Sequence, residues 1–314
     1  MDTLLFTVNA VFPIPLTILT GKCLHRLGWM PTQTANAVNK LCFNFLIPLN
    51  IFYQLHDAQP DNGADAGFLA YGVLFILVTL ALLCLLAPRF IKNRMHCGEF
   101  IQSVFRGNVS LISVSLLSNM YGEKSIQILS YLLPITLVLY NSLSVILLAY
   151  FFDRQEKVTL RKLLRAIVTN PFVLAVCIGM AFSSLRLRLP EFVEETMRSI
   201  SAAGTPLALM ALGTSISFCD LTHGAGKAVF AAFLRQMVIP AIVLWTAVAL
   251  GFRNEQLGAY LCIACTPTAT AGYVLVRNMG GDGKLTAQIA VYSVIFSFVS
   301  IFGFVFLFCS LGWM

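Results

Sequence analysis

Two polar segments interrupt apolar runs of the sequence, and both carry residue types that bind carboxylate anions. The first, "RGNVSLISVS", covers Arg106–Ser115, and the second, "TPTATAGY", covers Thr266–Tyr273. A guanidinium grips a carboxylate through two parallel hydrogen bonds, and an asparagine amide offers two donors and an acceptor. Proline lacks an N–H and clashes with the preceding turn, so Pro267 frees backbone groups around it. Together these residues predict an anion site built on two helix interruptions.

The candidate substrate-binding residues come from these two segments, with one further asparagine. They are Arg106, Asn108, Ser110, Ser113, Thr266, Pro267, Thr268, Thr270, Tyr273 and Asn50. Structural alternatives stay open for several of them. Arg106 and Arg235 can snorkel to the membrane surface, Pro267 can merely kink a helix, Tyr273 can be a packing residue, and Asn50 can serve interhelical hydrogen bonding. The side chains of Thr266, Thr268 and Thr270 point to the same side only if the backbone there is extended rather than helical.

The composition indicates which elements must position these residues. The 314 residues are 58% hydrophobic and 11% charged, with a mean hydropathy of +0.82, whereas soluble domains carry roughly 25% charged residues. A membrane-spanning helix needs about 20 mostly apolar residues. Ten such stretches are present, at 3–22, 33–55, 67–90, 98–121, 125–151, 167–185, 197–218, 227–250, 256–278 and 285–311. The sequence therefore predicts an all-α polytopic membrane protein with ten transmembrane helices.

The two polar segments fall near the midpoints of the fourth and ninth stretches. Asn108 marks the first and Pro267 the second. Unpaired backbone at membrane depth is tolerated only where protein or a water-filled cavity satisfies it. We therefore expect two broken helices that meet each other. The N-terminus of each second half, with its free N–H groups and partial positive charge, suits an anion.

Proline and glycine spacings predict an internal repeat. Landmarks that lie 158 or 159 residues apart are Pro13 and Pro171, Gly21 and Gly179, Pro31 and Pro190, Pro48 and Pro206, and the segments "NMYGE" and "NMGGD". We interpret residues 1–152 and 167–314 as two five-helix repeats joined by a cytoplasmic linker at 153–166. Because five is odd, the second repeat must enter the membrane inverted, which is the usual plan of a secondary transporter.

Basic residues in the loops predict the orientation. Thirteen Lys and Arg residues fall in the odd-numbered loops and five in the even-numbered ones, so the positive-inside rule places both termini outside. The net charge of +7 is then mainly a topology signal. Apart from the fifth loop, the basic residues do not gather in one run of the sequence. Their pattern therefore does not indicate nucleic-acid binding.

The sequence also argues against an enzyme. All fourteen acidic residues fall in loops or at the ends of the predicted spans, and Cys262 and Cys265 form a CxxC pair without a second pair or a nearby histidine. No nucleophile elbow, Walker loop or HExxH motif is present. We therefore expect no catalytic residue, no metal site and no cofactor. Coupling through a buried acid pair is disfavoured, while Na⁺ bound by carbonyls and hydroxyls near a break, or uncoupled movement, remains open.

Segments across nearly the whole chain resemble the auxin efflux carrier family, whose bacterial members include carriers of malonate and other organic acids. The resembling segments are "LCFNFLIPLNIFYQL", "FRGNVSLISVSLLSNMYGEKSI", "TNPFVLAVCIGM", "GTPLALMALGTSI" and "CTPTATAGYVLVRNMGGD". The resemblance implies ten helices in two inverted repeats with crossover helices 4 and 9, akin to the bile-acid symporter and sodium/proton antiporter folds. It also implies a scaffold of spans one, two, six and seven, often dimeric. The chain departs from the family pattern at Ser113 and Ser115, where a second glycine and a proline are usual.

The residues and the resemblance together predict a secondary active transporter or facilitator for a small organic anion. A mono- or dicarboxylate such as malonate is the expected substrate, moved by alternating access. A receptor that binds the same ligand without transport and an uncoupled anion channel remain alternatives. The expected partners are the anion, the lipid bilayer and a second copy bound through the scaffold helices. The expected location is the cell membrane, as a multi-pass protein of the bacterial inner membrane.

Overall fold

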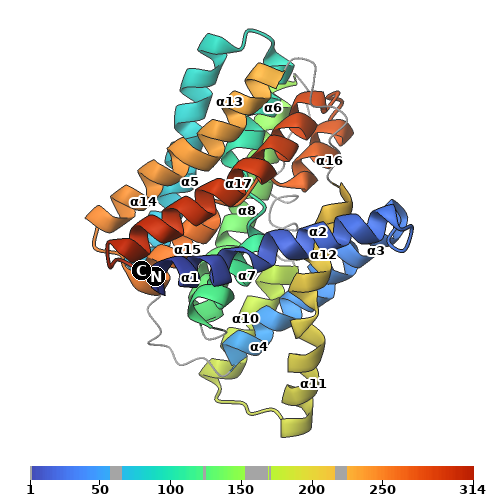
Figure 1. Ribbon diagram of the computed structural model, residues 1–314, viewed down its shortest axis with the longest axis vertical. Coiled ribbons are helices and arrows are strands. Elements are labelled where there is room, and N and C mark those ends of the chain that lie inside the picture. Colours follow the sequence, from blue (N-terminus) through green and yellow to red (C-terminus); the bar gives the residue numbers. More distant parts are fainter. Residues whose placement is uncertain (1, 57–65, 123–124, 153–168, 170, 216–224) are drawn as a thin grey trace. The chain divides into compact units, whose positions relative to one another are not determined.

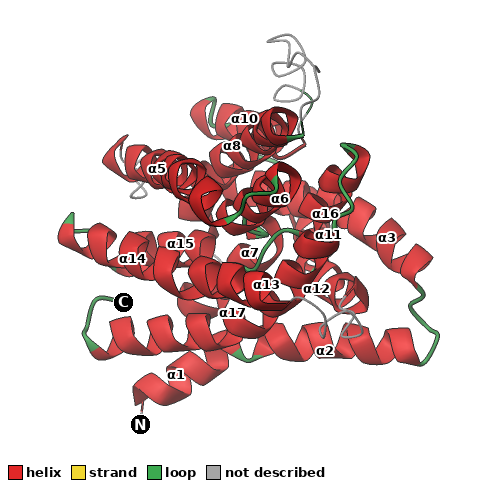
Figure 2. Cartoon of the chain, turned by 90° about the horizontal axis from the view of Figure 1, so that it is seen from above, coloured by secondary structure: helices red, strands yellow, loops and turns green. Residues whose placement is uncertain are grey.

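The computed structural model describes residues 2–56, 66–122, 125–152, 169, 171–215 and 225–314. The predicted linker at 153–166 lies outside these ranges. Within them the chain is helical and contains no strand, only one isolated antiparallel bridge between Gly107 and Thr268 (Figure 2). The prediction of an all-helical polytopic membrane protein is thus confirmed for the described residues.

Five described helical segments are long and apolar enough to cross a membrane. They are Leu4–Arg26, Ala66–Phe90, Ile126–Phe151, Gly226–Ala249 and Lys284–Ser310. These segments correspond to the first, third, fifth, eighth and tenth predicted stretches. The second, fourth, sixth, seventh and ninth stretches fold as shorter or interrupted helices, so ten spans remain a prediction.

The chain forms two compact units, which we describe separately. Unit 1 comprises Met1–Ala64, Ser110–Pro134 and Leu164–Ser217, and unit 2 comprises Asp65–Val109, Ile135–Leu163 and Phe218–Met314. Unit 1 thus combines the described parts of the first, second, sixth and seventh stretches with residues that follow the first interruption. The units do not follow the boundary between the two sequence repeats, whose existence stays a prediction.

Unit 1 is a set of closely packed helices (Figure 1). Its elements are α1 (Asp2–Val11), α2 (Pro13–Arg26), α3 (Thr32–Leu41), the π-helical turn η1 (Cys42–Leu46), α4 (Ile47–His56), α7 (Val109–Tyr121), the start of α8 (Ile126–Phe151), α10 (Pro171–Ser184), α11 (Glu191–Ala202) and α12 (Gly204–Ser215). Helices α2 and α12 pack together, as do α4 and α10. A Cβ atom at Gly21 would overlap the backbone of Met210, so glycine permits the close approach of α2 to α12.

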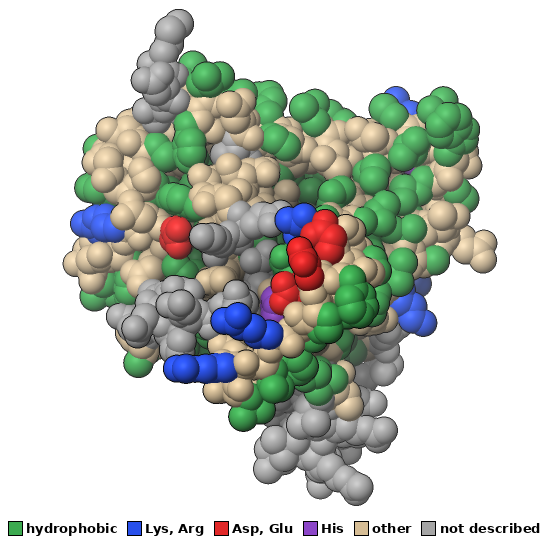
Figure 3. Space-filling model, turned by 90° about the horizontal axis from the view of Figure 1, so that it is seen from below, with side chains coloured by type: hydrophobic (Ala, Val, Ile, Leu, Met, Phe, Trp, Pro, Cys, Tyr) green, Lys and Arg blue, Asp and Glu red, His purple; other side chains and the backbone are tan. Residues whose placement is uncertain are grey.

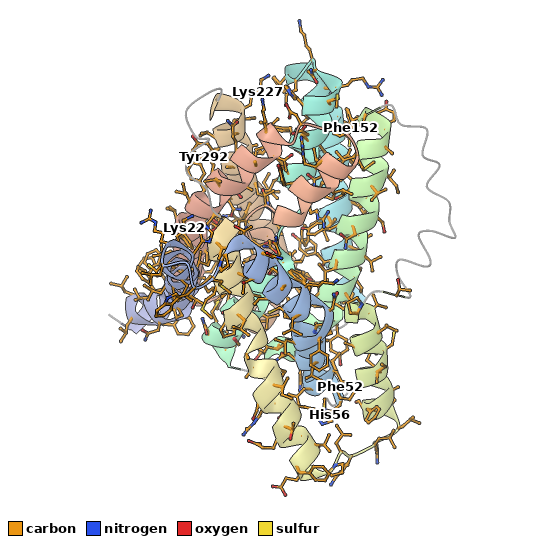
Figure 4. The ribbon with its side chains drawn as sticks, turned by 90° about the vertical axis from the view of Figure 1, so that its right-hand side faces the viewer. Lys22, Phe52, His56, Phe152, Lys227 and Tyr292 are labelled. Carbon is orange, nitrogen blue, oxygen red and sulfur yellow. The ribbon has the colours of Figure 1, made fainter. Side chains whose placement is uncertain are left out.

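Helix α4 also contacts the polar helix α11. Phe52 packs edge to face against Phe182 of α10, with 5.3 Å between the ring centroids. One turn later, Nε2 of His56 lies 3.3 Å from Oε1 of Glu194 on α11. Figure 4 labels Phe52 and His56 near the end of α4, and Figure 3 shows acidic side chains gathered beside a histidine on the surface.

The seventh predicted stretch, 197–218, requires a correction. The structure has two helices there, α11 and α12, separated at Ala203. Helix α11 begins at Glu191 and carries Glu194 and Glu195, so these carboxylates lie on a helix rather than in a loop. The apolar pattern of α12 led the prediction across a boundary that the polar residues of α11 mark.

Unit 2 contains α5 (Ala66–Phe90), α6 (Arg94–Phe105), the second part of α8, α13 (Ala225–Phe233), the π-helical turn η3 (Leu234–Val238), α14 (Ile239–Ala249), α15 (Asn254–Ala264), α16 (Thr270–Asn278) and α17 (Lys284–Ser310). Helix α17 packs against α13, α6 and α16, and α5 packs against α6. An aromatic cluster joins α5 to α15, where the Tyr260 hydroxyl donates to the carbonyl of Phe68 over 2.7 Å.

Two short helices in unit 2 are surrounded by protein. Every residue of α6 from Cys97 onward and every residue of α15 from Leu257 onward is buried. Both helices end at an interruption, and both interruptions lie in this unit. The core of unit 2 therefore holds the two interruptions, whereas Ser110–Ser115 of the first polar segment belong to unit 1.

Candidate functional site

The two interruptions face each other as a short antiparallel pair of extended segments. Helix α6 ends at Phe105 and α7 begins at Val109, while α15 ends at Ala264 and α16 begins at Thr270. The backbone N–H of Asn108 donates to the carbonyl of Pro267 over 2.7 Å. In return, the N–H of Ala269 donates to the carbonyl of Arg106 over 3.3 Å. The predicted breaks at Asn108 and Pro267 are confirmed, and their backbones pair directly.

The last carbonyls of α6 find partners outside their own helix. A helix leaves its final carbonyls unpaired unless other groups satisfy them. The Thr268 hydroxyl donates to the carbonyl of Ser103 over 2.8 Å. Nη1 of Arg235 donates to the carbonyls of Val104 and Phe105 over 3.4 and 3.2 Å. The first interruption is therefore stabilised by side chains of the ninth and eighth stretches.

Pro267 explains the end of α15. In a continuous helix residue 267 would donate to the carbonyl of Ile263, but proline has no N–H. Instead, the Thr266 hydroxyl and Nη2 of Arg235 donate hydrogen bonds to the Ile263 carbonyl, over 3.1 and 3.3 Å. The N–H of Thr268 turns instead to the hydroxyl of Ser293 on α17, over 3.0 Å. One proline thus redirects the backbone toward three different side chains.

The π-helical turn η3 presents Arg235 and Gln236 to the interruptions. Pro240 follows this turn and cannot donate to the carbonyl four residues earlier, which accounts for the widened helix. Gln236 donates from Nε2 to the carbonyl of Thr266 over 3.1 Å. A Cβ atom at Gly107 would overlap Nη2 of Arg235 and the hydroxyl of Thr266. Glycine at this position therefore leaves room for the guanidinium.

Arg106 lies at the start of the first extended segment. It is 9% exposed, and its Nη2 donates to Oδ1 of Asn141 on α8 over 2.7 Å. The ion pairs found among the described residues join His56 to Glu194 and Arg198 to Glu195, so Arg106 takes part in neither. Its burial disfavours the surface alternative. The guanidinium has further donors besides the one that binds the Asn141 amide oxygen among the described residues.

Several buried amide and hydroxyl groups near the interruptions lack a hydrogen-bond partner within the described part of the chain. They are Nε2 and Oε1 of Gln102, Oγ of Ser103, Nδ2 of Asn108 and Oε1 of Gln236. A Cβ atom at Gly272 would meet the amide of Gln102, so this amide lies against the first turn of α16. Buried polar groups are normally satisfied, and an unsatisfied cluster points to a ligand or ordered water.

The predicted threonines have structural partners. Both hydroxyls, of Thr266 and of Thr268, donate to backbone carbonyls, and both side chains are buried. Tyr273 is 40% exposed, and its ring lies where a Cβ atom of Gly283 would be. This placement favours the packing alternative for Tyr273. Substrate contact by Thr266, Thr268 or Tyr273 stays a prediction.

The remaining predicted residues are not all in the unit that holds the interruptions. Asn50 and Ser113 belong to unit 1, where Oδ1 of Asn50 has no partner among the described residues and Ser113 is fully buried. Ser110 also falls in unit 1, and its side chain, like that of Thr270, lies outside what the structure describes. The structure therefore brings together Arg106, Asn108 and the segment 266–268.

The sequence prediction left out or underweighted three residues of this group. Gln102 and Gln236 received no role, and Arg235 was a weaker candidate than Arg106. A signal was present for Arg235, since an arginine within an apolar span is costly and usually functional. Nothing in the local pattern marks Gln102, because its position depends on Gly272, a residue 170 positions later.

The arrangement offers binding rather than bond-making chemistry. It combines a buried guanidinium, amide N–H donors without a partner among the described residues, and the N-terminal turn of α16, all of which stabilise negative charge. No group of three or more His, Cys, Asp or Glu side chains suited to a metal occurs within the described ranges. Cys262 and Cys265 are buried and are not joined in a disulfide.

Comparisons with known proteins identify the family of the chain. A family model described as "Membrane transport protein" matches residues 6–305. An "Uncharacterized transporter" from Methanothermobacter thermautotrophicus is 21% identical over 300 residues, which cover 94% of this chain and 96% of that protein. The "Uncharacterized transporter YfdV" of Escherichia coli K12 is 22% identical over 302 residues, 92% of this chain and 93% of that protein.

A plant protein is similar over a shorter region. The "Auxin efflux carrier component 2" of Oryza sativa subsp. japonica is 22% identical over 137 residues, which cover 42% of this chain and 22% of that protein. The family match, by contrast, spans almost the whole chain. This chain therefore belongs to the membrane transport protein family, that of the auxin efflux carriers, and is a membrane transporter rather than an enzyme.

Proposed function

We propose that this transporter moves a small organic anion, a mono- or dicarboxylate such as malonate, by alternating access. The anion binds where the extended segments Arg106–Asn108 and Thr266–Ala269 pair in unit 2. The observation that carries the proposal is the cluster of buried donors beside this pair. It combines the Arg106 guanidinium with Nδ2 of Asn108 and Nε2 of Gln102, which have no partner among the described residues.

The strengths of the interactions rank the residues. A hydrogen bond to a charged group contributes about 1.5–3 kcal/mol, whereas a helix N-terminus contributes about 0.3–1 kcal/mol toward an anion. Arg106 is therefore the principal anchor for one carboxylate. Asn108, Gln102 and the N–H groups of the first turn of α16 bind the rest of the substrate. The two carboxylates of a dicarboxylate bind Arg106 and this second set of donors, respectively. A monocarboxylate depends on Arg106 alone.

The architecture proposed for this activity has ten spans in two inverted five-helix repeats, with both termini outside the cell membrane. Matched interruptions in the fourth and ninth spans are typical of inverted-repeat transporters, which bind substrate where such breaks meet. The five long apolar helices, the paired interruptions and the proline spacings all support it. A second copy bound through the helices of the first, second, sixth and seventh spans is part of the same proposal.

Uptake of labelled malonate into proteoliposomes tests the function. The wild type is compared with Arg106→Ala and Asn108→Ala, and with Arg94→Ala at the opposite end of α6 as a matched control. Arg94 is exposed and stacks on Tyr150. Saturable uptake that both site variants lose and the control keeps supports the proposal. Binding without uptake indicates a receptor, uptake that does not saturate indicates a channel, and absence of both contradicts the substrate class.

A further inference from the structure

Arg235 is a buried cation that no carboxylate of the described residues neutralises. Its side chain is 2% exposed, and it is the largest of the fully buried side chains in the described part of the chain. It belongs to neither of the ion pairs found within the described ranges. An uncompensated buried charge is strongly unfavourable, so other groups must stabilise this guanidinium.

Backbone carbonyls at the ends of two helices supply that stabilisation. At the end of α6, Nη1 donates to the carbonyls of Val104 and Phe105. At the end of α15, Nη2 donates to the carbonyl of Ile263 over 3.3 Å. Two residues past that helix, the carbonyl of Thr266 accepts from Nη2 over 3.1 Å and from Nε over 3.2 Å. All three guanidinium nitrogens are engaged, and each bond is strengthened by the charge of the donor.

The positive charge of Arg235 matches the partial negative charges at the C-terminal ends of α6 and α15. The C-terminal end of a helix carries the equivalent of about −0.5 elementary charge. The ends of α6 and α15 therefore present about −1 together, which the single positive charge of Arg235 balances. The hydroxyl of Tyr140 also lies close to the Arg235 guanidinium and to the backbone of Gly107.

A carbonyl cluster at the ends of broken helices is also a place where transporters hold a coupling cation. We propose that Arg235 is the resident cation of this cluster: its guanidinium permanently fills the place of a free monovalent cation, and removing the side chain opens a site for one. Arg235 is then a positioning residue, since it ties both interruptions together without contacting substrate. That last consequence rests on the proposed function, whereas the cation site does not.

Thermal unfolding of the purified full-length protein in detergent tests this inference. Guanidinium chloride is added at millimolar, non-denaturing concentrations, with choline chloride at equal ionic strength as the reference. We expect Arg235→Ala to unfold at a lower temperature than the wild type and to regain stability with guanidinium. The gain should grow with the logarithm of guanidinium concentration, as binding to the folded state requires.

Arg253→Ala is the matched control. Arg253 also donates to carbonyls near a helix end, those of Val248 and Phe252, but it is only partly buried and serves one helix. Water can replace its side chain, so the control should show no gain from guanidinium. A missing response in Arg235→Ala, or an equal response in the wild type and the control, overturns the inference.

A second pair of variants covers the case in which Arg235→Ala does not fold. Arg235→Lys keeps the positive charge, and Arg235→Met has a similar length without it. The inference expects the Lys variant to be recovered folded and the Met variant to be recovered folded only with guanidinium present. A Met variant as stable as the wild type, or equal loss of both variants with no guanidinium response, overturns it. The readout uses no substrate, so failure to transport malonate contradicts only the proposed function.

Discussion

The N–H of Asn108 donates to the carbonyl of Pro267, joining two residues that lie 159 positions apart over 2.7 Å. These are the two residues at which the fourth and ninth apolar stretches break. Each interruption therefore satisfies part of the backbone that the other leaves open. This hydrogen bond uses main-chain atoms only. Substitutions of the Asn108 side chain can therefore test substrate binding while the backbone hydrogen bond remains.

Replacing Arg106 should weaken anion binding. Arg106→Ala removes a buried guanidinium whose bond to a carboxylate is worth about 1.5–3 kcal/mol, which corresponds to an affinity loss of about 10- to 150-fold. Equilibrium binding of malonate to the purified protein measures the loss, with Arg94→Ala as the control. Affinity unchanged by Arg106→Ala would place the anion elsewhere.

Changing Asn108 to aspartate should be more harmful to binding than changing it to alanine. Nδ2 of Asn108 is buried and unpartnered among the described residues, so it is available as a donor to substrate. Asn108→Ala loses that donor, at a cost of about 1 kcal/mol, whereas Asn108→Asp also adds a negative charge that repels the anion. Binding titrations of the two variants, after thermal unfolding shows that both are folded, give the comparison. Equal affinities for Asn108→Asp and the wild type would contradict the assignment.

Gly107 should tolerate no side chain. A methyl group there overlaps the Arg235 guanidinium and the hydroxyl of Thr266, so Gly107→Ala must disturb the bonds that hold both helix ends. Overpacking of this kind costs about 1–3 kcal/mol. Gly226→Ala, where a Cβ atom meets nothing within 4 Å, is the control and should be neutral or slightly stabilising. Thermal unfolding in detergent distinguishes the two. Similar midpoints for both variants would show that the guanidinium can move without loss.

Gly272 should influence affinity more than stability. A Cβ atom there meets the amide of Gln102, which is the far end of a flexible side chain and can move aside. Gly272→Ala should therefore redirect the Gln102 amide and change malonate affinity several-fold, with little effect on the unfolding midpoint. Gly303→Ala on α17, where the added atom contacts nothing, is the control. An affinity equal to that of the control would remove Gln102 from the proposed site.

The sequence predicts those features that depend on local chemistry. Pro267 ends a helix because it lacks an N–H, and the glycine and asparagine after Arg106 allow an extended segment, so both interruptions could be placed correctly. The all-helical class follows from hydropathy alone. By contrast, the partners of each group depend on contacts between distant segments. The guanidinium of Arg235 meets carbonyls 28 to 131 residues away, and no local pattern contains that information.

Other differences between sequence and structure have local causes. The boundary at Ala203 was missed because an apolar window cannot separate a polar helix from the apolar helix that follows it. The sequence predicts substrate contact by Thr266 and Thr268, and the structure adds a backbone role, since both hydroxyls donate to carbonyls near the helix ends. Threonine beside a helix break thus satisfies the backbone that the break exposes.

The π-helical turn Leu234–Val238 gives the eighth stretch an unusual sensitivity to changes in length. This turn contains one residue more than an α-helical turn would, and that extra residue sets the direction in which Arg235 points. Deleting a single residue in the turn would remove the extra residue and convert the segment to a regular α-helix, which changes the direction in which Arg235 points. A span that keeps its full hydropathy would in this way lose the contacts of Arg235 with both helix ends, so the number of residues between Ala225 and Pro240 matters as much as their apolar character.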